Sequence, residues 1–581
     1  MRRWTCRCAV VLVAALAVAC DGAGGADDTV GPGPDAVDPG TVAGDDGLPD
    51  GTGDPGVRDV SDPGTDDGMP GDVPPTDPGT DVPLPVVPYM LIVSQDDLLT
   101  VANEWATYRR AGGFEVEVTT VTDLAGDTPD ATDFQDAVRG RLGTIRDARG
   151  STERLFLLLL GDAPAEGAAA AGRIPAHDCE NTTPGAGGCW TDNRYADLDG
   201  DTIPDAAAGR VPARTVAEAR TVLAKVQDFE ATYKVGEWNR RVGLYVGQAG
   251  FSAEIDSVLE LAMMDGLKRV SHAFDVLGAW DNPNSSYWYV PFNDKVVDLF
   301  NQGALMTVYV GHGSESWTQG LTTDQVAKVH CNNRRPFSMF FACYAGNYAS
   351  AQDSLAETLA FKADGPVASF GSSDVSHPYG NAVLAYESQM KALEMRYPTI
   401  GEVIVAIKRG MLENDDDFRK FMEGAGALDE SCDTPEKQVE ILRQHNDLYN
   451  LLGDPATAMQ YPREVATFDA PTGTLASRHV QVAGTAPGVI TGTATVTLET
   501  ERDVVLGTMA TIDPNHVVKA DVNANWLKAN DKGVVRLDVP VVNGRFEATL
   551  DWTAQTGGGD YYLKVYARDQ TTDAVGVADF H

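Results

Sequence analysis

Two residues that could form a nucleophile and its acid–base partner, His312 and Cys343, stand at the ends of two apolar segments. His312 lies in LMTVYVGHGSES, and Cys343 lies in FSMFFACYAGNY. In each segment an apolar run, typical of a buried strand, ends in glycine and other small residues. A thiol beside an imidazole can become a thiolate that attacks a carbonyl carbon. The two segments therefore predict nucleophilic catalysis by Cys343, with His312 as general acid and base.

Strands and helices alternate around these segments, from about residue 88 to about residue 460. Further strands are expected in YMLIVS, FEVEVTTV, RLFLLLLGDA, VGLYVGQ and PVASFGSS. Helices are expected at about 131–149, 253–267, 352–363, 381–396, 400–411 and 435–450. This alternation predicts an open, mainly parallel α/β sheet with helices on both faces. Because ligands bind beyond the carboxyl ends of such strands, His312, Cys343 and Asp374 are expected in one cleft.

The chain resembles the gingipain-like cysteine peptidases of the caspase-like clan. The resemblance rests on LLLLGDA, TDNRYADLDGDTIPDAAAGRVPARTVAEA, VYVGHGSES, FFACYAGNY, SFGSSD and LLGDPA, in this order. The order His-then-Cys is also that of caspase-like enzymes. The resemblance implies a cysteine endopeptidase acting on proteins or peptides, with Cys343 as nucleophile and His312 as acid–base group. It also implies an oxyanion hole made by the backbone N–H groups of Gly313 and Cys343.

Two other functions stay open at this point. The family includes a sortase-like transpeptidase, which uses the same dyad but transfers the acyl group to an amine. A surface binding lipoprotein on a peptidase scaffold would keep Cys343 without using it.

An acidic segment, DLDGDTIPD, precedes the Gly209-Arg210 pair. By the resemblance, Asp205 occupies the place of an acidic third member that could orient His312. The carboxylates of the acidic segment alternate with small residues, and such hard oxygen ligands suit Ca²⁺. The predicted ligands of this structural Ca²⁺ site are Asp197, Asp199, Asp201 and Asp205. A solvated acidic turn, or a strand-leading cap at Asp205, is the alternative; no organic cofactor is expected.

The segment GSSDVSHPYG, after a predicted strand, is expected to line the substrate pocket with Ser373 and Asp374. In gingipains an acid in this pocket selects a basic residue before the scissile bond, so Asp374 would favour Arg or Lys. Asp374 could instead cap the turn that follows it.

The amino terminus, MRRWTCRCAVVLVAALAVAC, is typical of an export signal. LAVAC resembles a lipobox, so residues 1–19 are predicted to be a lipoprotein signal peptide and Cys20 to carry lipid. A plain signal peptide cut near Ala19 is the alternative. Residues 20–85, rich in Asp, Pro and Gly, predict a disordered tether. We therefore expect an exported bacterial lipoprotein, anchored in a lipid bilayer at the cell surface or on the periplasmic face.

Export implies an oxidising compartment, in which cysteines pair. Cys179 and Cys189 enclose a short Gly/Pro/Thr loop and are expected to form a disulfide. Cys331 and Cys432 could form a second one, which leaves Cys343 unpaired. A zinc site at the first pair, with His177, lacks a clear fourth ligand.

The net charge and the pattern of strands and turns predict the partners and the domain boundaries. A net charge of −40 argues against nucleic-acid binding. The peptidase domain is expected at 86–462, with subdomains at about 86–235 and 236–462. Residues 463–581 show short alternating strands between Gly, Asn and Asp turns, which predict an immunoglobulin-like β-sandwich.

Overall fold

The computed structural model describes residues 86–165, 170–231, 233–248, 263–264, 266–427, 430–553 and 559–581. The predicted signal peptide, Cys20, the tether and most of the helix expected at 253–267 lie outside these residues. In the described part of the chain, no helix is both long enough and apolar enough to span a membrane.

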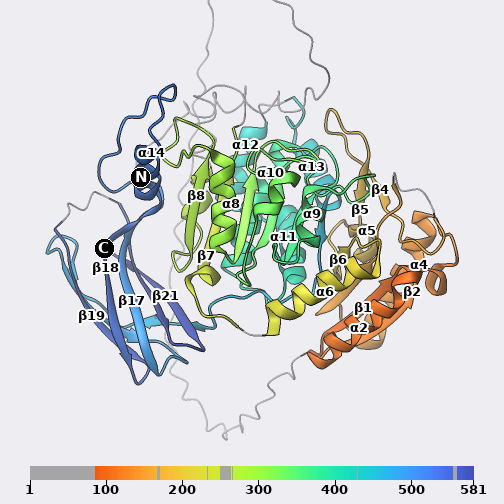
Figure 1. Ribbon diagram of the computed structural model, residues 1–581, viewed down its shortest axis with the longest axis horizontal. Helices are drawn as coiled ribbons and strands as arrows, with labels where there is room; N and C mark the ends of the chain where they lie inside the picture. Colours follow the sequence, from red (N-terminus) through yellow and green to blue (C-terminus); the bar gives the residue numbers. More distant parts are fainter. Residues whose placement is uncertain are drawn as a thin grey trace, which may run out of the picture. The chain divides into compact units, whose positions relative to one another are not determined.

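A ten-stranded sheet organises the larger part of the protein (Figure 1). Its strand order is β2-β1-β3-β6-β12-β11-β10-β9-β7-β8. The strands are β1 (Tyr89–Ser94), β2 (Glu115–Thr120), β3 (Leu155–Leu160), β6 (Ala207–Val211), β7 (Arg241–Val246), β8 (Asp275–Trp280), β9 (Met306–Val310), β10 (Phe337–Phe341), β11 (Ala368–Ser372) and β12 (Tyr449–Leu452). Among the described strands, neighbours are parallel except β11 and β12. The predicted mainly parallel sheet is confirmed, and its two halves run in opposite directions.

Helices cover both faces of each half because successive strand residues are buried on alternate sides. In β9, Met306 and Val308 belong to one core and Tyr309 to the other. Leu91 and Ile92 of β1 are divided in the same way. Burial on both faces explains why these strands read as continuous apolar runs.

The covering helices form four groups, one for each face of each half. In the first half, α2 (Leu99–Ala111) and α6 (Val216–Ala231) share one core, and α4 (Ala131–Arg149) and α5 (Asn193–Ala196) share the other. In the second half, α10 (Pro378–Leu393), α11 (Ile400–Glu413), α12 (Asp417–Gly426) and α13 (Pro435–Leu448) share one core, and α8 (Phe292–Gln302) and α9 (Leu355–Phe361) share the other.

The carboxyl-terminal part consists mainly of β-strands, as predicted. Its nine-stranded sheet has the order β13-β21-β20-β17-β18-β19-β16-β14, with β15 paired to β16. The strands are β13 (Glu464–Val465), β14 (Thr467–Phe468), β15 (Thr472–Thr474), β16 (His479–Thr485), β17 (Thr491–Thr500), β18 (Gly533–Val542), β19 (Arg545–Asp551), β20 (Tyr561–Arg568) and β21 (Asp573–Phe580). A single residue pair, Val542 with Arg545, links β18 to β19, so the sheet divides into two parts there.

One helix in this region, α14 (Lys519–Asn530), is not predicted by the strand pattern. Trp526 explains its position, because the indole N–H donates to the carbonyl of Gly278 in β8 at 2.7 Å. The helix therefore forms through a tertiary contact rather than through an amphipathic repeat.

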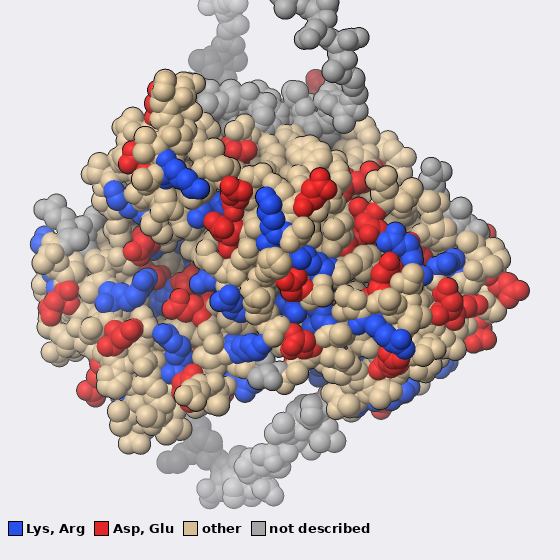
Figure 2. Space-filling view, viewed as in Figure 1, with Lys and Arg blue, Asp and Glu red and all other residues tan. Residues whose placement is uncertain are grey.

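The surface in Figure 2 carries both signs of charge. Lys and Arg side chains lie among Asp and Glu side chains, and neither sign forms a continuous patch on this face.

Candidate active site

The register of β9 and β10 brings His312 and Cys343 side by side. Met306 pairs with Phe337 and Val310 with Phe341, so paired residues are 31 positions apart in the sequence. His312 and Cys343 have the same separation, and each lies two residues beyond the end of its strand. Adjacent strands lie about 4.8 Å apart. His312 and Cys343 therefore lie at the same level of the sheet, just beyond neighbouring strand ends.

Gly313 allows the histidine loop to approach the nucleophile closely. A Cβ atom at Gly313 would lie 2.9 Å from Cβ of Ala342 and 3.2 Å from the carbonyl oxygen of Cys343. Any larger residue would push the loop away from β10. The two predicted oxyanion-hole residues, Gly313 and Cys343, thus come from backbone segments in contact.

The loop that carries His312 is held by Tyr309 of β9. The phenol donates to the carbonyl oxygen of His312 at 2.7 Å and accepts from the backbone N–H of Gln319 at 3.2 Å. Burial raises the pKa of Tyr309 above its ordinary range, so the phenol stays protonated and can keep donating. The imidazole is therefore carried by a loop whose backbone is fixed.

The chain turns sharply immediately after Cys343. Tyr344 has φ of +58°, a left-handed conformation that costs a non-glycine residue about 1–2 kcal/mol. Its N–H donates to the carbonyl of Asp374 at 3.0 Å, and the N–H of Gly346 donates to Ser372 at 2.8 Å. These bonds to the β11 end hold the strained turn, which presents the Cys343 side chain at the strand end.

Burial also determines the resting state of the thiol. It raises the pKa of Cys343 above its ordinary value, while hydrogen bonds from Ser376 oppose that rise. At neutral pH the resting residue is mainly a thiol, and a base must remove its proton before attack. An imidazole at the neighbouring strand end suits this task.

The comparisons with known proteins agree with this geometry. The family model described as "Peptidase family C25" matches residues 84–460, well over half of the chain. The chain belongs to peptidase family C25. It is therefore a cysteine-type peptidase, and His312 and Cys343 both lie inside the matched region.

Three solved structures are similar to the chain at low sequence identity. One described as "Structure of Protease" is 18% identical, with a TM-score of 0.50, covering 85% of this chain and 97% of that one. The "Arg specific cysteine proteinase gingipain R (RGPB)" is 16% identical, with a TM-score of 0.47, covering 85% and 98%. The complex of Porphyromonas gingivalis RgpB pro- and mature domains is 16% identical, with a TM-score of 0.47. This match covers 85% of this chain and 100% of that one. No curated protein matches the chain.

In this C25 peptidase, Asp205 does not orient His312. Asp205 directly precedes β6, and the order β6-β12-β11-β10-β9 puts four strand spacings, roughly 19 Å, between it and the histidine strand. Its carboxylate instead accepts from the backbone N–H of Leu198 at 2.8 Å. The prediction of a catalytic role for Asp205 is wrong because strand order separates residues that a family motif suggests are close.

The acidic segment does gather carboxylates. Ligand atoms of Asp197, Asp199 and Asp205 lie within 4.8 Å of one another, and Asp201 is not among them. The Asp201 carboxylate instead accepts from the N–H of Ile203 at 2.7 Å. Three of the four predicted calcium ligands therefore converge.

Ser373 and Asp374 do not line an open pocket, because both are fully buried. The Asp374 carboxylate accepts from Nδ2 of Asn181 at 3.0 Å and from the N–H of Gly187 at 3.2 Å. Ser373 donates to the carbonyl of Trp190 at 2.7 Å. The predicted substrate-pocket role is corrected: these residues hold the 179–189 hairpin, a partner that their own loop does not reveal.

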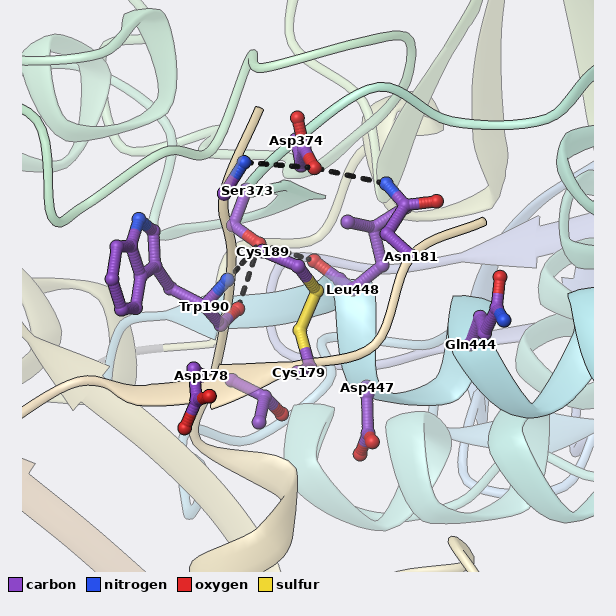
Figure 3. Close-up of a disulfide and its surroundings, with 12 residues drawn as sticks. Asp178, Cys179, Asn181, Cys189, Trp190, Ser373, Asp374, Gln444, Asp447 and Leu448 are labelled. Carbon is purple, nitrogen blue, oxygen red and sulfur yellow. Dashed lines mark hydrogen bonds between the residues drawn. A yellow bond between two sulfur atoms is a disulfide. The ribbon is translucent and has the colours of Figure 1, made fainter. Parts of the chain in front are cut away.

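That hairpin is closed by a disulfide. Cys179 and Cys189 are joined, as Figure 3 shows, at the paired ends of β4 (His177–Cys179) and β5 (Cys189–Thr191). Cys331 and Cys432 are not joined to each other. Cys331 belongs to the core beneath α8 and α9, whereas Cys432 belongs to the core on the opposite face of the sheet. The suggested second disulfide is therefore wrong.

A buried ion pair supports the loop that follows Cys343. This pair was not predicted from the sequence. Arg210 of β6 is fully buried and binds Asp192 through Nε at 2.8 Å and Nη2 at 2.7 Å. The Tyr348 hydroxyl, five residues after Cys343, donates to the same carboxylate at 3.2 Å. An arginine inside an apolar strand requires a buried acid, so Arg210 was the available signal.

Proposed function

We propose that this C25 peptidase is an exported endopeptidase that cleaves peptide bonds with Cys343 and His312. The observation that carries the proposal is the β9–β10 register, which sets both residues at one level of the sheet. His312 takes the proton from the thiol, and the thiolate attacks the peptide carbonyl carbon. His312 then protonates the leaving amine as the C–N bond breaks, which leaves a thioester. Water, deprotonated by His312, hydrolyses the thioester.

The backbone N–H groups of Gly313 and Cys343 are proposed to stabilise the oxyanion of the tetrahedral intermediate. Support comes from the contact between the two backbone segments. A side chain at position 313 would disturb this contact, since it would meet the Cys343 carbonyl.

The test compares cleavage of a mixed peptide library by the wild type, Cys343→Ala and His312→Ala. Cys331→Ala is the matched control, because it removes a buried thiol outside the site. We expect cleavage by the wild type and the control only. Cleavage by Cys343→Ala would overturn the assignment, and products carrying an added amine would identify a transpeptidase. Absence of all cleavage would favour the binding lipoprotein.

Cleavage after basic residues is proposed to depend on Asp281 rather than on Asp374. Asp281 follows β8, at the same sheet edge as His312, and its N–H donates to Val246 of the adjacent strand at 2.9 Å. The side chain is partly exposed and lies within electrostatic range of Tyr309. A carboxylate there can pair with an Arg or Lys side chain of the substrate.

We also propose that Asp197, Asp199 and Asp205 bind a structural Ca²⁺. Three convergent carboxylates are the donors that Ca²⁺ prefers. Calcium should raise the midpoint of thermal unfolding relative to a chelator, and Asp199→Asn should reduce that rise. Identical melting with calcium and with chelator would contradict the proposal.

Export with lipidation of Cys20 completes the proposed function. The lipobox-like LAVAC motif supports it. Metabolic labelling with a fatty-acid analogue should mark the wild type and not Cys20→Ser. Equal labelling of both would reject the anchor.

A further inference from the structure

The Cys343 sulfur has close polar contacts with Ser376, in the loop between β11 and α10. The N–H of Ser376 donates to Sγ at 3.4 Å, and the Ser376 hydroxyl lies 3.8 Å from Sγ. The carbonyl of Ser376 lies 3.9 Å from the same sulfur. Sulfur accepts at longer distances than oxygen because of its larger radius, and Ser376 is buried from water. The hydroxyl and the backbone N–H of Ser376 therefore both lie close to the nucleophilic sulfur.

Two further side chains fix the Ser376 hydroxyl. Nδ2 of Asn381, in the first turns of α10, donates to Oγ of Ser376 at 2.8 Å. The Tyr449 hydroxyl, at the start of β12, donates to Oδ1 of Asn381 at 2.6 Å. The amide thus occupies an acceptor site on the serine oxygen and leaves the hydroxyl proton for an acceptor. A negatively charged sulfur is the strongest acceptor within reach.

We propose that Ser376 is a catalytic residue that stabilises the Cys343 thiolate by donating both its N–H and its hydroxyl to the sulfur. This proposal rests on the proposed function of Cys343 as the nucleophile. When His312 removes the thiol proton, the S–H bond breaks, an N–H bond forms on the imidazole, and the Ser376 hydroxyl turns toward the anion. Asn381 and Tyr449 are positioning residues, since they act through Ser376.

Other titratable groups lie near the sulfur and also influence the pKa of the Cys343 thiol. They come from β9 and its loop, the nucleophile turn, the β11 loop and β12, and they are Tyr309, His312, Tyr344, Asp374 and Tyr449. A substitution at position 376 leaves these side chains in place, although the Tyr449 phenol also interacts with the Ser376 hydroxyl. A shift in that variant therefore reports the lost hydroxyl.

The test measures alkylation of Cys343 by iodoacetamide as a function of pH, with the modified peptide quantified by mass spectrometry. Removing one hydrogen bond to a charged group should move the midpoint for Ser376→Ala upward by roughly one pH unit. Ser376→Thr restores the hydroxyl and should return the midpoint to the wild-type value. Ser388→Ala is the matched control, because that buried α10 hydroxyl bonds only to Ala385 of its own helix in the described contacts.

An unchanged midpoint in folded Ser376→Ala would overturn the proposal. If that variant does not fold, Asn381→Ala decides: it should raise the midpoint by less, and an unchanged midpoint would again overturn the proposal. Alkylation needs no substrate. It therefore tests Ser376 independently of whether Cys343→Ala abolishes cleavage.

Discussion

The ion-pair sites in one half of the ten-stranded sheet and the His312–Cys343 site in the other half hold their polar groups in different ways. In the half with β3 and β6, buried charges meet charges of opposite sign: Arg210 binds Asp192, and Arg109 binds Asp454 at 2.6 Å. In the half with β9 and β10, Cys343 and the loop of His312 are held by uncharged donors and acceptors, namely Tyr309, Ser376 and backbone groups. Paired charges fix structure, whereas uncharged partners leave a reactive group able to change its protonation state.

This comparison predicts that activity and stability separate between the halves. The largest expected effect is on activity: His312→Ala should lower kcat/KM by about 10³-fold, because general acid–base catalysis is lost. Unfolding by denaturant should be unchanged. His330→Ala, which alters an exposed histidine paired with Asp364, is the control and should keep full activity. A parallel loss of stability in His312→Ala would erase the distinction.

The reverse behaviour is expected in the other half. Asp192→Asn leaves the fully buried Arg210 guanidinium without its counter-charge and should cost about 3–5 kcal/mol of unfolding free energy. Chemical denaturation followed by tryptophan fluorescence measures this. Glu104→Gln, which removes the exposed partner of Arg220, should leave the denaturation midpoint unchanged. An Asp192→Asn protein as stable as the wild type would show that the pair is dispensable.

Asp374 sharpens the comparison because it is a buried acid that stands beside the dyad. Asp374→Ala removes the acceptor of Asn181 and Gly187 and should cost about 1–3 kcal/mol of unfolding free energy. The preference for the residue before the scissile bond should be retained. Asp178→Ala, which changes an exposed acid next to Cys179, should have no effect on stability. Loss of basic-residue preference in Asp374→Ala alone would restore the pocket assignment.

The smallest effect is expected at Asp281, whose pKa is raised to about 6 by burial. The carboxylate is charged above that pH and becomes neutral as the pH falls through about 6. KM for substrates with Arg or Lys before the scissile bond should therefore rise by about tenfold between pH 7 and pH 5, the size of one lost ion pair in a partly buried site. Asp281→Asn should show the high KM at both pH values. If the ratio of KM for basic substrates to KM for neutral substrates did not change with pH, a role of Asp281 in substrate selection would be excluded.

The sequence predicted the elements well, because apolar periodicity and glycine ends are local signals. The helix expected at 131–149 is α4 (Ala131–Arg149), and the strands that carry His312 and Cys343 end where their apolar runs end. Helix α14 escaped prediction because its contact partner, Gly278, lies more than 200 positions away in the sequence. The assignments that failed at Asp205, Asp374 and Cys331–Cys432 all concern partners distant along the chain.

The sequence by itself determined the reactive side chains and the strands that end at them, since residue type and hydrophobic pattern are encoded locally. Only the tertiary structure decided which polar groups meet. Strand order put Asp205 four strands from His312, and the packing of the disulfide hairpin on the β11 loop buried Asp374. The same packing brought Ser376 to the sulfur. Contacts between strands and loops depend on pairing and register, which no single segment specifies.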